Sequence, residues 1–520
     1  PGKTVVVDSR ETAPSAADPP MFLDSRREPF PFDIRSTSGV AVGVPGMVRG
    51  IEYALGTWGT MSLANILAPA IELATKGFRI SQYLEDHIRE GLNGGRLSNE
   101  QGNPSYDMAR SIFAPSGVPL KHGDMLVQPD LARTFRLLAD KGPDTFYTGD
   151  IAQAIVTTQQ YARTIPSTED APRLQGRMTV ADLSAYTAVV RQPVEAHYRG
   201  YRITSTPPPS SGGLTVLQIL KLLERFPLGD FTQGFGLGAT RTLHLMLEAM
   251  RLAFADRAVW MGDADKVAVP INGLLHHDYI ATRTTLISPE DRQQRATPGN
   301  PLPYEGSTKT PVTHIQSSSA TFQEGTNTTH FTIIDELGNI VTYTNTIESA
   351  WGTGLMVPGY GFLLNNELTD FNPVPTFNAD PHHYNPGAND VAPGKRPRSS
   401  MAPTLIFHHE KPIAAYGSPG GATIINSVVN IVLNLIDHHL NIQESVDVPR
   451  ISQTTTNGRL IFEAGFSLDV VNALRTLGHD LTDTHLSRIG SVQAVAIDEM
   501  TKLRYGAADR RRPGSVMSLR

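Results

Sequence analysis

The chain has 520 residues, of which 40% are hydrophobic and 18% are charged, a composition typical of soluble globular proteins. Its formal net charge of −6 is too small to indicate nucleic acid or a membrane surface as a partner. The absence of cysteine excludes disulfides, thiol catalysis and cysteine-ligated metals. No apolar run approaches the ~18 residues of a membrane-spanning helix, so no membrane span is expected.

The first third of the chain is predicted to be mainly helical. Apolar residues recur at helical spacing after Pro45, where proline suits the first turn of a helix. The predicted elements are a strand at 4–8, helices between Pro45 and Glu85 and at 129–141 and 149–161, and a polar loop at 90–125.

The next segment combines one strand with two long helices. Residues 198–204 are predicted to form an edge strand, because Pro207, Pro208 and Pro209 end it. Leucines at helical spacing predict helices at 214–226 and 239–261. Residues 285–325 are rich in Pro, Thr, Ser and Gln and are predicted to be an exposed linker.

The remainder changes to antiparallel strands. The turn signal at 336–339 lies between two alternating segments and predicts a hairpin. The predicted hairpins are 331–334 with 340–346, 404–407 with 413–416, and 492–497 with 503–506, and helices are predicted at 422–438 and 467–478.

A Thr-Thr-His step begins the first of these strands, at Thr328. A threonine hydroxyl becomes a good nucleophile when a base lies beside it, and an N-terminal threonine supplies its own α-amine as that base. Self-cleavage between Asn327 and Thr328 would create that amine. Taken alone, the step favours a plain strand start, since β-branched residues begin strands in many proteins.

Gly417-Ser418-Pro419-Gly420-Gly421 lies between a predicted strand and a predicted helix. Paired glycines let the backbone approach a ligand closely, and successive N–H groups at a helix N-terminus can hold an anion. These are the parts of an oxyanion hole. A simple strand-to-helix turn is the alternative.

Two further polar clusters suit the two ends of an amino acid. Glu367 and Asp370, three residues apart, could face the same way and hold an ammonium group, or form a solvated turn. Ser399 and Ser400 follow two arginines and could bind a carboxylate, or belong to a basic surface loop. The histidine doublets do not predict a metal site, because adjacent side chains point apart, and no motif for a cofactor is present.

Together these motifs resemble the γ-glutamyltranspeptidases, a family of N-terminal-nucleophile hydrolases. The resemblance spans the whole chain and rests on motifs in family order. These are D-S-R-E-T-A-P at 8–14, P-P-P-S-S-G-G at 207–213, T-T-H-F at 328–331, G-T-G at 352–354, L-N-N-E-L-T-D-F at 364–371, K-R-P-R-S-S-M-A-P-T at 395–404 and G-S-P-G-G at 417–421.

The resemblance implies an α+β fold, a four-layer αββα sandwich, built from a precursor that cuts itself into subunits 1–327 and 328–520. It implies γ-glutamyl transfer from, and hydrolysis of, amides such as glutathione, with water, an amino acid or a dipeptide as acceptor. It also implies a periplasmic or secreted location and no cofactor. Members of this family usually carry a helix and a glycine-rich strand before D-x-R-E, whereas only seven residues precede Asp8 here, so this segment is expected to be either missing or left out of the given sequence.

The resemblance also assigns residue roles. Thr328 would be the nucleophile, and Thr346 would hydrogen-bond its amine or hydroxyl. Gly420 and Gly421 would form the oxyanion hole. Arg10, with Ser399 and Ser400, would hold the substrate α-carboxylate, and Glu367 with Asp370 would hold its α-ammonium.

One departure from the family pattern and one possible lid complete the prediction. Glu348 replaces the asparagine of many transpeptidases and would accept a hydrogen bond from the amine, as in some bacterial relatives. Residues 372–394 match a lid region. Two alternatives stay open: a member specialised for another acyl amide, such as a glutaryl amide or a biosynthetic γ-glutamyl intermediate, and a non-catalytic binding protein that never matures.

Overall fold

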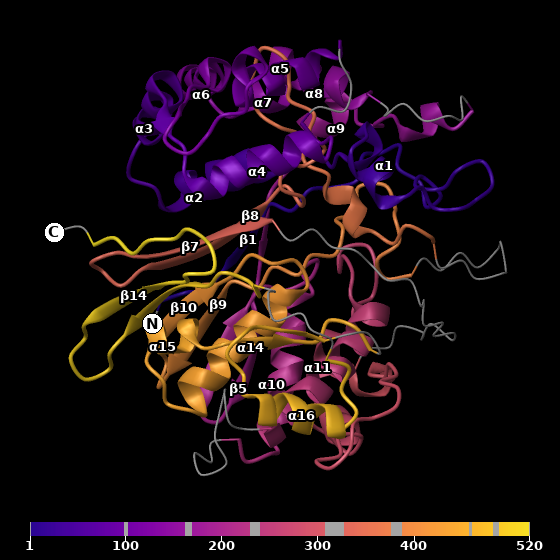
Figure 1. The fold of residues 1–520 in the computed structure, drawn as a ribbon, viewed down its shortest axis with the longest axis vertical. Helices are drawn as coiled ribbons and strands as arrows, with labels where there is room; N and C mark the ends of the chain where they lie inside the picture. The colour runs from indigo at the N-terminus through magenta and orange to yellow at the C-terminus, as the bar shows by residue number, and fades with distance from the viewer. Residues whose placement is uncertain are drawn as a thin grey trace.

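The computed structural model describes residues 2–97, 102–161, 169–228, 240–306, 327–375, 387–456, 460–481 and 488–518. Figure 1 shows four layers from top to bottom: helices, a small sheet, a larger sheet and a second set of helices. The labelled chain ends lie on the same side of the molecule (Figure 1).

The lower sheet has six antiparallel strands and joins the two halves of the sequence. Its central contact pairs β6 with β9, with Thr204 opposite Leu405. In spatial order the strands are β14 (Arg504–Ala508), β13 (Gln493–Ile497), β10 (Lys411–Gly417), β9 (Thr404–His408), β6 (Tyr201–Ser205) and β5 (Val194–Tyr198).

The upper sheet is formed by the predicted hairpin. Strand β7 (Thr328–Ile334) pairs with β8 (Ile340–Thr346), and Gly338 occupies the left-handed region (φ 87°) that the turn requires. The hairpin packs on the six-stranded sheet, where the hydroxyl of Thr342 meets the carbonyl of Tyr416 at 3.5 Å. This contact places the middle of β8 above the end of β10.

Short strand pairs accompany the two sheets. They are β1 (Val6–Asp8) with β4 (Val189–Arg191), β2 (Phe78–Arg79) with β3 (Met125–Leu126), and β11 (Ile451–Ser452) with β12 (Ile461–Phe462).

The lower helices cover the outer face of the six-stranded sheet and form the largest apolar core with it. Helix α10 is buried along nearly its whole length, because it lies between the sheet and α11. The helices are α10 (Gly212–Leu223), α11 (Thr240–Trp260), α12 (Ile271–Leu275), α13 (His277–Thr284), α14 (Thr423–Ile436), α15 (Ile442–Asp447) and α16 (Leu468–Thr476).

The upper helices come from the first 184 residues, and some of them begin at clear capping signals. The side chain of Ser62 accepts from the backbone N–H of Asn65, and that of Ser81 from Leu84. The helices are α1 (Phe32–Ser36), α2 (Met47–Trp58), α3 (Leu63–Lys76), α4 (Gln82–Asn93), α5 (Pro104–Phe113), α6 (Pro129–Lys141), α7 (Asp144–Tyr147), α8 (Gly149–Gln159) and α9 (Val180–Ser184).

Two predictions of local structure were wrong. Residues 90–125 contain helix α5, which Asn103 caps and Pro104 begins, so the polar composition concealed a standard start signal. The segment 198–204 forms the interior strand β6 and the end of β5, because β9 pairs with β6 from a distant part of the chain. The edge of the sheet is β5.

Most of the other predicted elements are confirmed within about two residues, including the helices at 129–141, 422–438 and 467–478. Two predictions fall largely or partly outside the described residues. These are the linker at 285–325, of which 307–325 is not described, and the lid at 372–394, of which 376–386 is not described. Within the described part of the chain, no helix is both long and apolar enough to span a membrane.

Candidate functional site

One small cavity collects nearly all the residues singled out from the sequence. Its lining is polar apart from Met401, Gly421 and Ile424. Every predicted site residue lines it except Gly420, which precedes the lining residue Gly421. The lining consists of Arg10, Thr328, Thr346, Glu348, Glu367, Asp370, Ser399, Ser400, Met401, Gly421 and Ile424.

Thr328 and Thr346 lie opposite each other because they begin and end the two strands of the upper hairpin. The hydroxyl of Thr346 donates to the carbonyl oxygen of Asn327 at 3.2 Å and accepts from the N–H of Glu348 at 2.9 Å. The family resemblance predicted that the Thr346 hydroxyl forms a hydrogen bond with the amine or hydroxyl of Thr328. In the continuous chain it instead contacts the carbonyl of the peptide bond that self-cleavage would break.

The glycine loop lies between β10 and α14, as predicted. Gly420 and Gly421 have φ values of 140° and 57°, which residues with a Cβ rarely adopt. The hydroxyl of Thr423 donates to the carbonyl of Gly420 at 2.8 Å. The carbonyl of Gly420 is thereby tied to the first turn of α14, and Gly421 faces the cavity.

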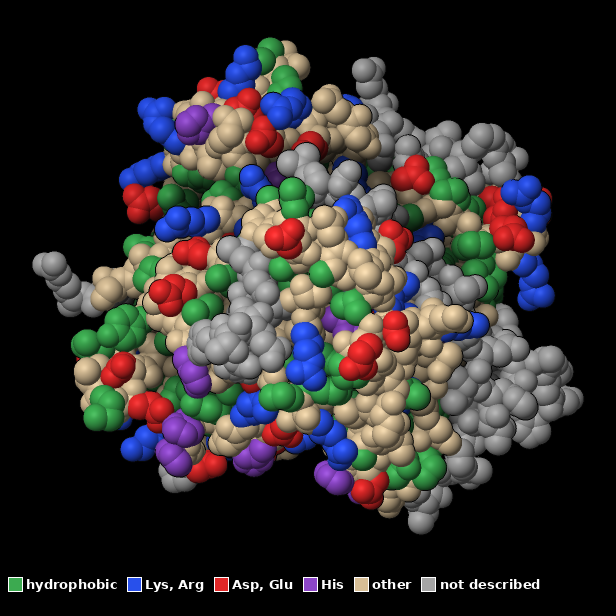
Figure 2. All heavy atoms as spheres, turned by 60° about the horizontal axis from the view of Figure 1, so that its bottom comes forward, with side chains coloured by type: hydrophobic (Ala, Val, Ile, Leu, Met, Phe, Trp, Pro, Cys, Tyr) green, Lys and Arg blue, Asp and Glu red, His purple; other side chains and the backbone are tan. Residues whose placement is uncertain are grey.

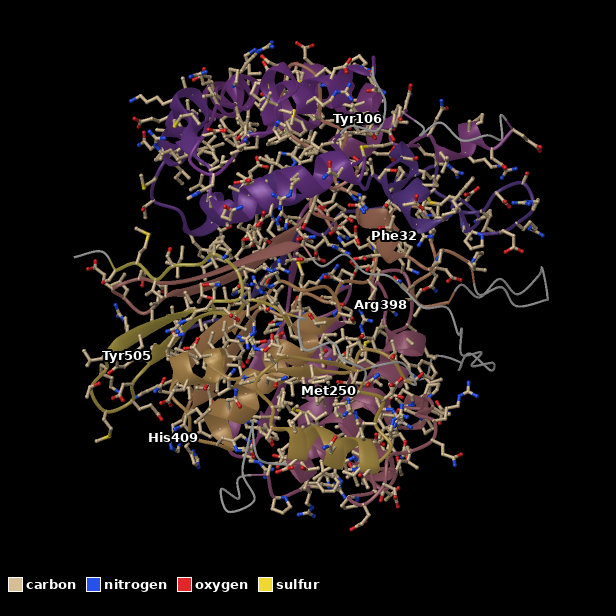
Figure 3. All side chains as sticks on the ribbon, viewed as in Figure 1. Phe32, Tyr106, Met250, Arg398, His409 and Tyr505 are labelled. Carbon is tan, nitrogen blue, oxygen red and sulfur yellow. The ribbon has the colours of Figure 1, made fainter. Side chains whose placement is uncertain are left out.

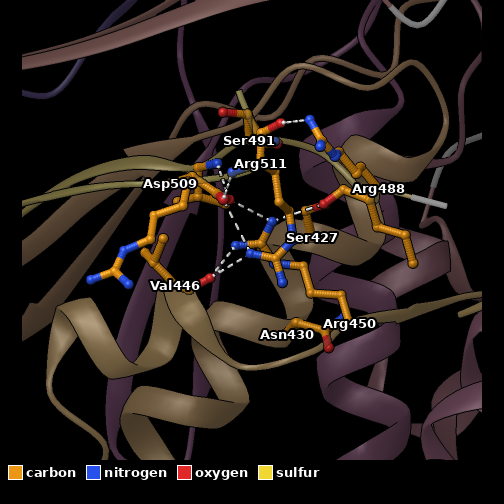
Figure 4. A network of polar contacts seen from close by, with 12 residues as sticks. Ser427, Asn430, Val446, Arg450, Arg488, Ser491, Asp509 and Arg511 are labelled. Atoms are coloured by element: carbon orange, nitrogen blue, oxygen red, sulfur yellow. Dashed lines mark hydrogen bonds and ion pairs between the residues drawn. The ribbon is translucent and has the colours of Figure 1, made fainter. Parts of the chain in front are cut away.

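A second segment supports the glycine loop from behind. The N–H of Ser491 donates to the Ser418 hydroxyl at 2.9 Å, and that hydroxyl donates to the carbonyl of Pro419 at 2.8 Å. The fully buried Arg450 holds this segment by donating to the carbonyl of Ile489 at 2.8 Å and pairing with Asp509 at 2.8 Å (Figure 4). The loop geometry therefore depends on a buried ion pair outside the cavity.

His330 connects the strand of Thr328 with the strand that leads to the glycine loop. Its ring is buried and is hydrogen-bonded to the hydroxyls of Thr344 at 2.8 Å and Thr332 at 3.0 Å. The ring lies directly on Gly417, where an added Cβ would come within 2.6 Å of Nδ1 and 2.9 Å of Nε2. Burial lowers the pKa of His330 to about 3, so it is neutral and acts as a spacer between the two sheets.

Arg10 and two acids form a compact ion cluster. Its guanidinium donates to Glu367 Oε1 and to Asp370 Oδ2, each at 2.5 Å, and its Nε donates to the carbonyl of Pro397 at 3.3 Å. Burial alone would lower the pKa of Arg10, but the charges of Glu367 and Asp370 raise it, so this side chain stays charged. The family resemblance predicted that Arg10 holds the α-carboxylate of a substrate and that the two acids hold its α-ammonium. In the structure, Arg10 and the two acids are in direct contact with each other.

The acids outnumber the arginine in this part of the cavity. Burial, followed by the charge of Asp370, raises the pKa of Glu348 to about 7. One oxygen of Glu348 accepts hydrogen bonds from Ser349 and Asn366. Among the described residues, Glu348 Oε1 and Glu367 Oε2 are buried without a hydrogen-bond donor. Such acceptors favour a cationic donor in the cavity.

Two serines also line the cavity. The Ser399 hydroxyl accepts from the N–H of Met401 at 3.0 Å, and the Ser400 hydroxyl accepts from the buried side chain of Arg257 at 2.7 Å. Sequence reasoning missed Arg257, Met401 and Ile424. No motif marked Arg257, because its approach to Ser400 depends on how α11 packs.

Among the described residues, no three His, Asp or Glu side chains are grouped so that they could hold a metal ion. Figure 2 shows acidic and basic side chains mixed over one face of the molecule, with histidines as scattered spots.

Comparison with known proteins places these features in one family. The family profile described as Gamma-glutamyltranspeptidase matches residues 1–519. The chain is 41% identical to a glutathione hydrolase proenzyme of Bacillus subtilis (strain 168), over 99% of this chain and 81% of that protein. It is 33% identical to an acylase ACY 1 proenzyme of Pseudomonas sp. (strain SE83), over 100% of this chain and 83% of that protein.

A solved structure shares the fold. The cephalosporin acylase from Bacillus halodurans superposes with a TM-score of 0.79 at 24% identity, covering 99% of this chain and 84% of that one. This likeness confirms the predicted α+β architecture. With the profile match and the identity to a near-full-length relative, it follows that this chain belongs to the γ-glutamyltranspeptidase family.

Proposed function

We propose that this protein is a γ-glutamyltransferase and glutathione hydrolase that matures by cutting itself before Thr328. The observation that carries the proposal is the convergence of Thr328, Gly421, the acids and the serines on one small cavity. These residues come from distant parts of the chain. Their grouping matches the demands of acyl transfer from an amino-acid-headed amide.

Maturation would begin with attack of the Thr328 hydroxyl on the carbonyl carbon of Asn327. The C–N bond breaks, the acyl group moves to the hydroxyl as an ester, and water then releases Asn327 as a carboxylate. The hydrogen bond from Thr346 to the Asn327 carbonyl at 3.2 Å supports this step, because it withdraws electron density from the attacked carbon. The product is a free α-amine on Thr328.

That amine would then act as the base of the mature enzyme. It takes the proton of the Thr328 hydroxyl as the oxygen attacks the substrate γ-carbonyl. The N–H groups of Gly420 and Gly421 stabilise the developing negative charge, and the amine of the leaving group departs with a proton. The γ-glutamyl ester is resolved by water, giving glutamate, or by an amino acid or dipeptide, giving a new amide.

The rest of the cavity would hold the amino-acid head of the donor. The buried acceptors on Glu348 and Glu367 suit an α-ammonium group, and the hydroxyls of Ser399 and Ser400 suit an α-carboxylate. Arg10 contributes a permanent positive charge beside Glu367 and Asp370. Holding the head at both ends brings the γ-carbonyl to Thr328 at high effective concentration.

Maturation would leave a heterodimer of residues 1–327 and 328–520. The printed name of the Bacillus subtilis relative, a proenzyme, supports processing of this kind. Family membership is also the support for a periplasmic or secreted location.

Intact-mass analysis of the purified protein under denaturing conditions tests maturation directly. We expect two fragments that meet at Asn327 and Thr328, with masses that sum to the chain plus one water. Thr328→Ala should give one uncut chain that releases no product from a γ-glutamyl anilide. Thr328→Ser, which keeps a hydroxyl, is the matched control and should retain cleavage. Normal turnover by Thr328→Ala would refute the nucleophile assignment.

A second candidate is an acylase that accepts glutaryl amides, and the acylase relative favours testing it. A glutaryl group lacks the α-amine, so it would leave the buried oxygens of Glu348 and Glu367 without a donor. We therefore expect kcat/KM to be higher for a γ-glutamyl anilide than for the glutaryl anilide. The reverse order would favour the acylase.

A further inference from the structure

A fully buried asparagine, Asn366, contacts both segments that carry the acids of the cavity. Its backbone carbonyl begins the 3-10 helix η6 (Glu367–Asp370), where it accepts from the N–H of Thr369 at 3.1 Å and from the Thr369 hydroxyl at 2.8 Å. Its side-chain amide donates to Oε2 of Glu348, which lies just after β8. Asn366 therefore links Glu348 to the turn that presents the other two acids.

A backbone donor fixes the orientation of this amide. The N–H of Ser349 donates to Oδ1 of Asn366 at 3.1 Å. Because a backbone N–H can only donate, Oδ1 must be the acceptor end of the amide and Nδ2 its donor end. The group that meets Glu348 is therefore an N–H donor.

The two oxygens of the Glu348 carboxyl have different surroundings. Oε2 accepts from Nδ2 of Asn366 and from the hydroxyl of Ser349, the latter at 2.6 Å. A carboxylate oxygen has two acceptor positions, so the protein fills both positions of Oε2. Oε1 is buried and has no hydrogen-bond donor among the described residues. Because Glu348 lines the cavity, Oε1 is the oxygen that is left to accept from a bound substrate.

The backbone at Glu348 also depends on its neighbours. Its φ of 75° lies in the left-handed region, which costs free energy for a residue other than glycine. The N–H of Glu348 donates to the Thr346 hydroxyl at 2.9 Å, and the N–H of Asn366 donates to the carbonyl of Ile347 at 3.3 Å. Asn366 thus bonds to Glu348 and to both residues that flank it.

The same contacts favour the charged form of Glu348. Burial, followed by the charge of Asp370, raises the pKa of this carboxyl, and the hydrogen bonds from Ser349 and Asn366 lower it. An ionised carboxylate accepts stronger hydrogen bonds from an ammonium group than a neutral acid does. Loss of the Asn366 amide would therefore weaken both the orientation and the charge of this acceptor.

The turn that carries the other two acids is held by contacts that do not involve the Asn366 side chain. Helix α1 packs against η6. Arg10 donates to both acids of η6 and to the carbonyl of Arg398 at 3.4 Å. Figure 3 shows Arg398 below Phe32, which begins α1. A change confined to the Asn366 side chain should therefore act mainly on Glu348.

We infer that Asn366 is a positioning residue for donor specificity: its side chain holds Oε2 of Glu348 so that Oε1 accepts from the α-ammonium of the donor substrate. The inference rests on the proposed function, since it concerns recognition of the same amino-acid head. Asn366 itself does not line the cavity. Its effect is therefore expected in KM for substrates that carry the ammonium group.

Three anilides separate this role from a general structural one. The γ-glutamyl anilide has both head groups, the 4-aminobutyryl anilide keeps only the ammonium, and the glutaryl anilide keeps only the carboxylate. We expect Asn366→Ala to raise KM for the two ammonium substrates by about 5- to 10-fold, the factor that corresponds to a typical hydrogen bond. The KM for the glutaryl anilide should change less than about 2-fold, because this substrate has no group that donates to Oε1. For all three substrates, kcat should change little.

A double-mutant cycle tests whether Asn366 acts through Glu348. In the Glu348→Gln background, Asn366→Ala should change the ratio of KM values little further, because two residues are not additive when one acts through the other. Asn434→Ala is the matched control: Asn434 is a buried asparagine on α14 whose side chain donates to the carbonyl of Ser445 at 3.0 Å. This change should lower thermal stability without changing the ratio of KM values between the substrates.

Three results would overturn the inference: equal losses on all three anilides, an unchanged KM ratio in Asn366→Ala, or full additivity with Glu348→Gln. If Asn366→Ala does not mature, Ser349→Ala carries the same comparison, since the Ser349 hydroxyl donates to the same oxygen of Glu348. An unchanged KM ratio in that variant would then overturn the inference. Failure of the wild type to turn over the γ-glutamyl anilide would instead count against the proposed function.

Discussion

The buried carboxyl of Glu348 predicts an unusual dependence of stability on pH. Its pKa is raised from 4.5 to about 7 by burial and by the charge of Asp370. The folded protein therefore keeps a proton that the unfolded chain loses between pH 4.5 and about 7. Stability from this group is fully present below pH 4.5 and is lost as the pH rises through that window.

The size of the effect follows from the shift. The difference between 4.5 and about 7 corresponds to about 3 kcal/mol in the free energy of unfolding. A chain of 520 residues has an unfolding entropy of roughly 1 kcal/mol/K, so this energy corresponds to about 3 °C in Tm.

Glu348→Gln isolates this contribution, because the amide resembles the protonated acid and does not titrate. Tm of the wild type and the variant should be measured by differential scanning calorimetry from pH 5 to pH 8, in the Thr328→Ala background so that the chain stays in one piece. We expect the wild type to lose about 3 °C relative to the variant over this range. Parallel curves would refute the reasoning, since Glu348 would then titrate alike in the folded and unfolded chains.

Three further predictions concern the site and its supports. Thr346→Ala removes the donor to the Asn327 carbonyl and should slow self-cleavage by about 10- to 100-fold, measured as the fraction of cut chain over time. Thr346→Ser keeps a hydroxyl and should restore the cleavage rate. An unchanged rate in Thr346→Ala would contradict a role of Thr346 in self-cleavage. Gly417→Ala places a methyl group against His330 and should destabilise the protein by about 1–3 kcal/mol, seen as a lower Tm. An unchanged Tm would show that the His330 ring can move away from residue 417 at no cost. Arg10→Ala leaves the buried acids Glu367 and Asp370 without their cation and should raise KM for the γ-glutamyl anilide by at least about 10-fold. An unchanged KM would exclude Arg10 from binding the amino-acid head of the substrate.

Much of the local structure could be predicted from patterns within short stretches of sequence. The turn at 336–339 with alternating residues on both sides predicted the β7–β8 hairpin, and this pairing alone places Thr346 opposite Thr328. The missed helix α5 also carried a local signal at Asn103 and Pro104. The motifs in family order named the site residues, and the cavity brings nearly all of them together.

The sequence by itself therefore determined the main elements, the family and the chemical types gathered at the site, because these depend on spacing along the chain. Only the tertiary structure decided which groups touch. The pairing of β6 with β9, the contact of Arg10 with Glu367, the ring of His330 on Gly417 and the approach of Arg257 to Ser400 all join residues far apart in sequence. Such contacts follow from how whole layers pack, and no local pattern of residues records them.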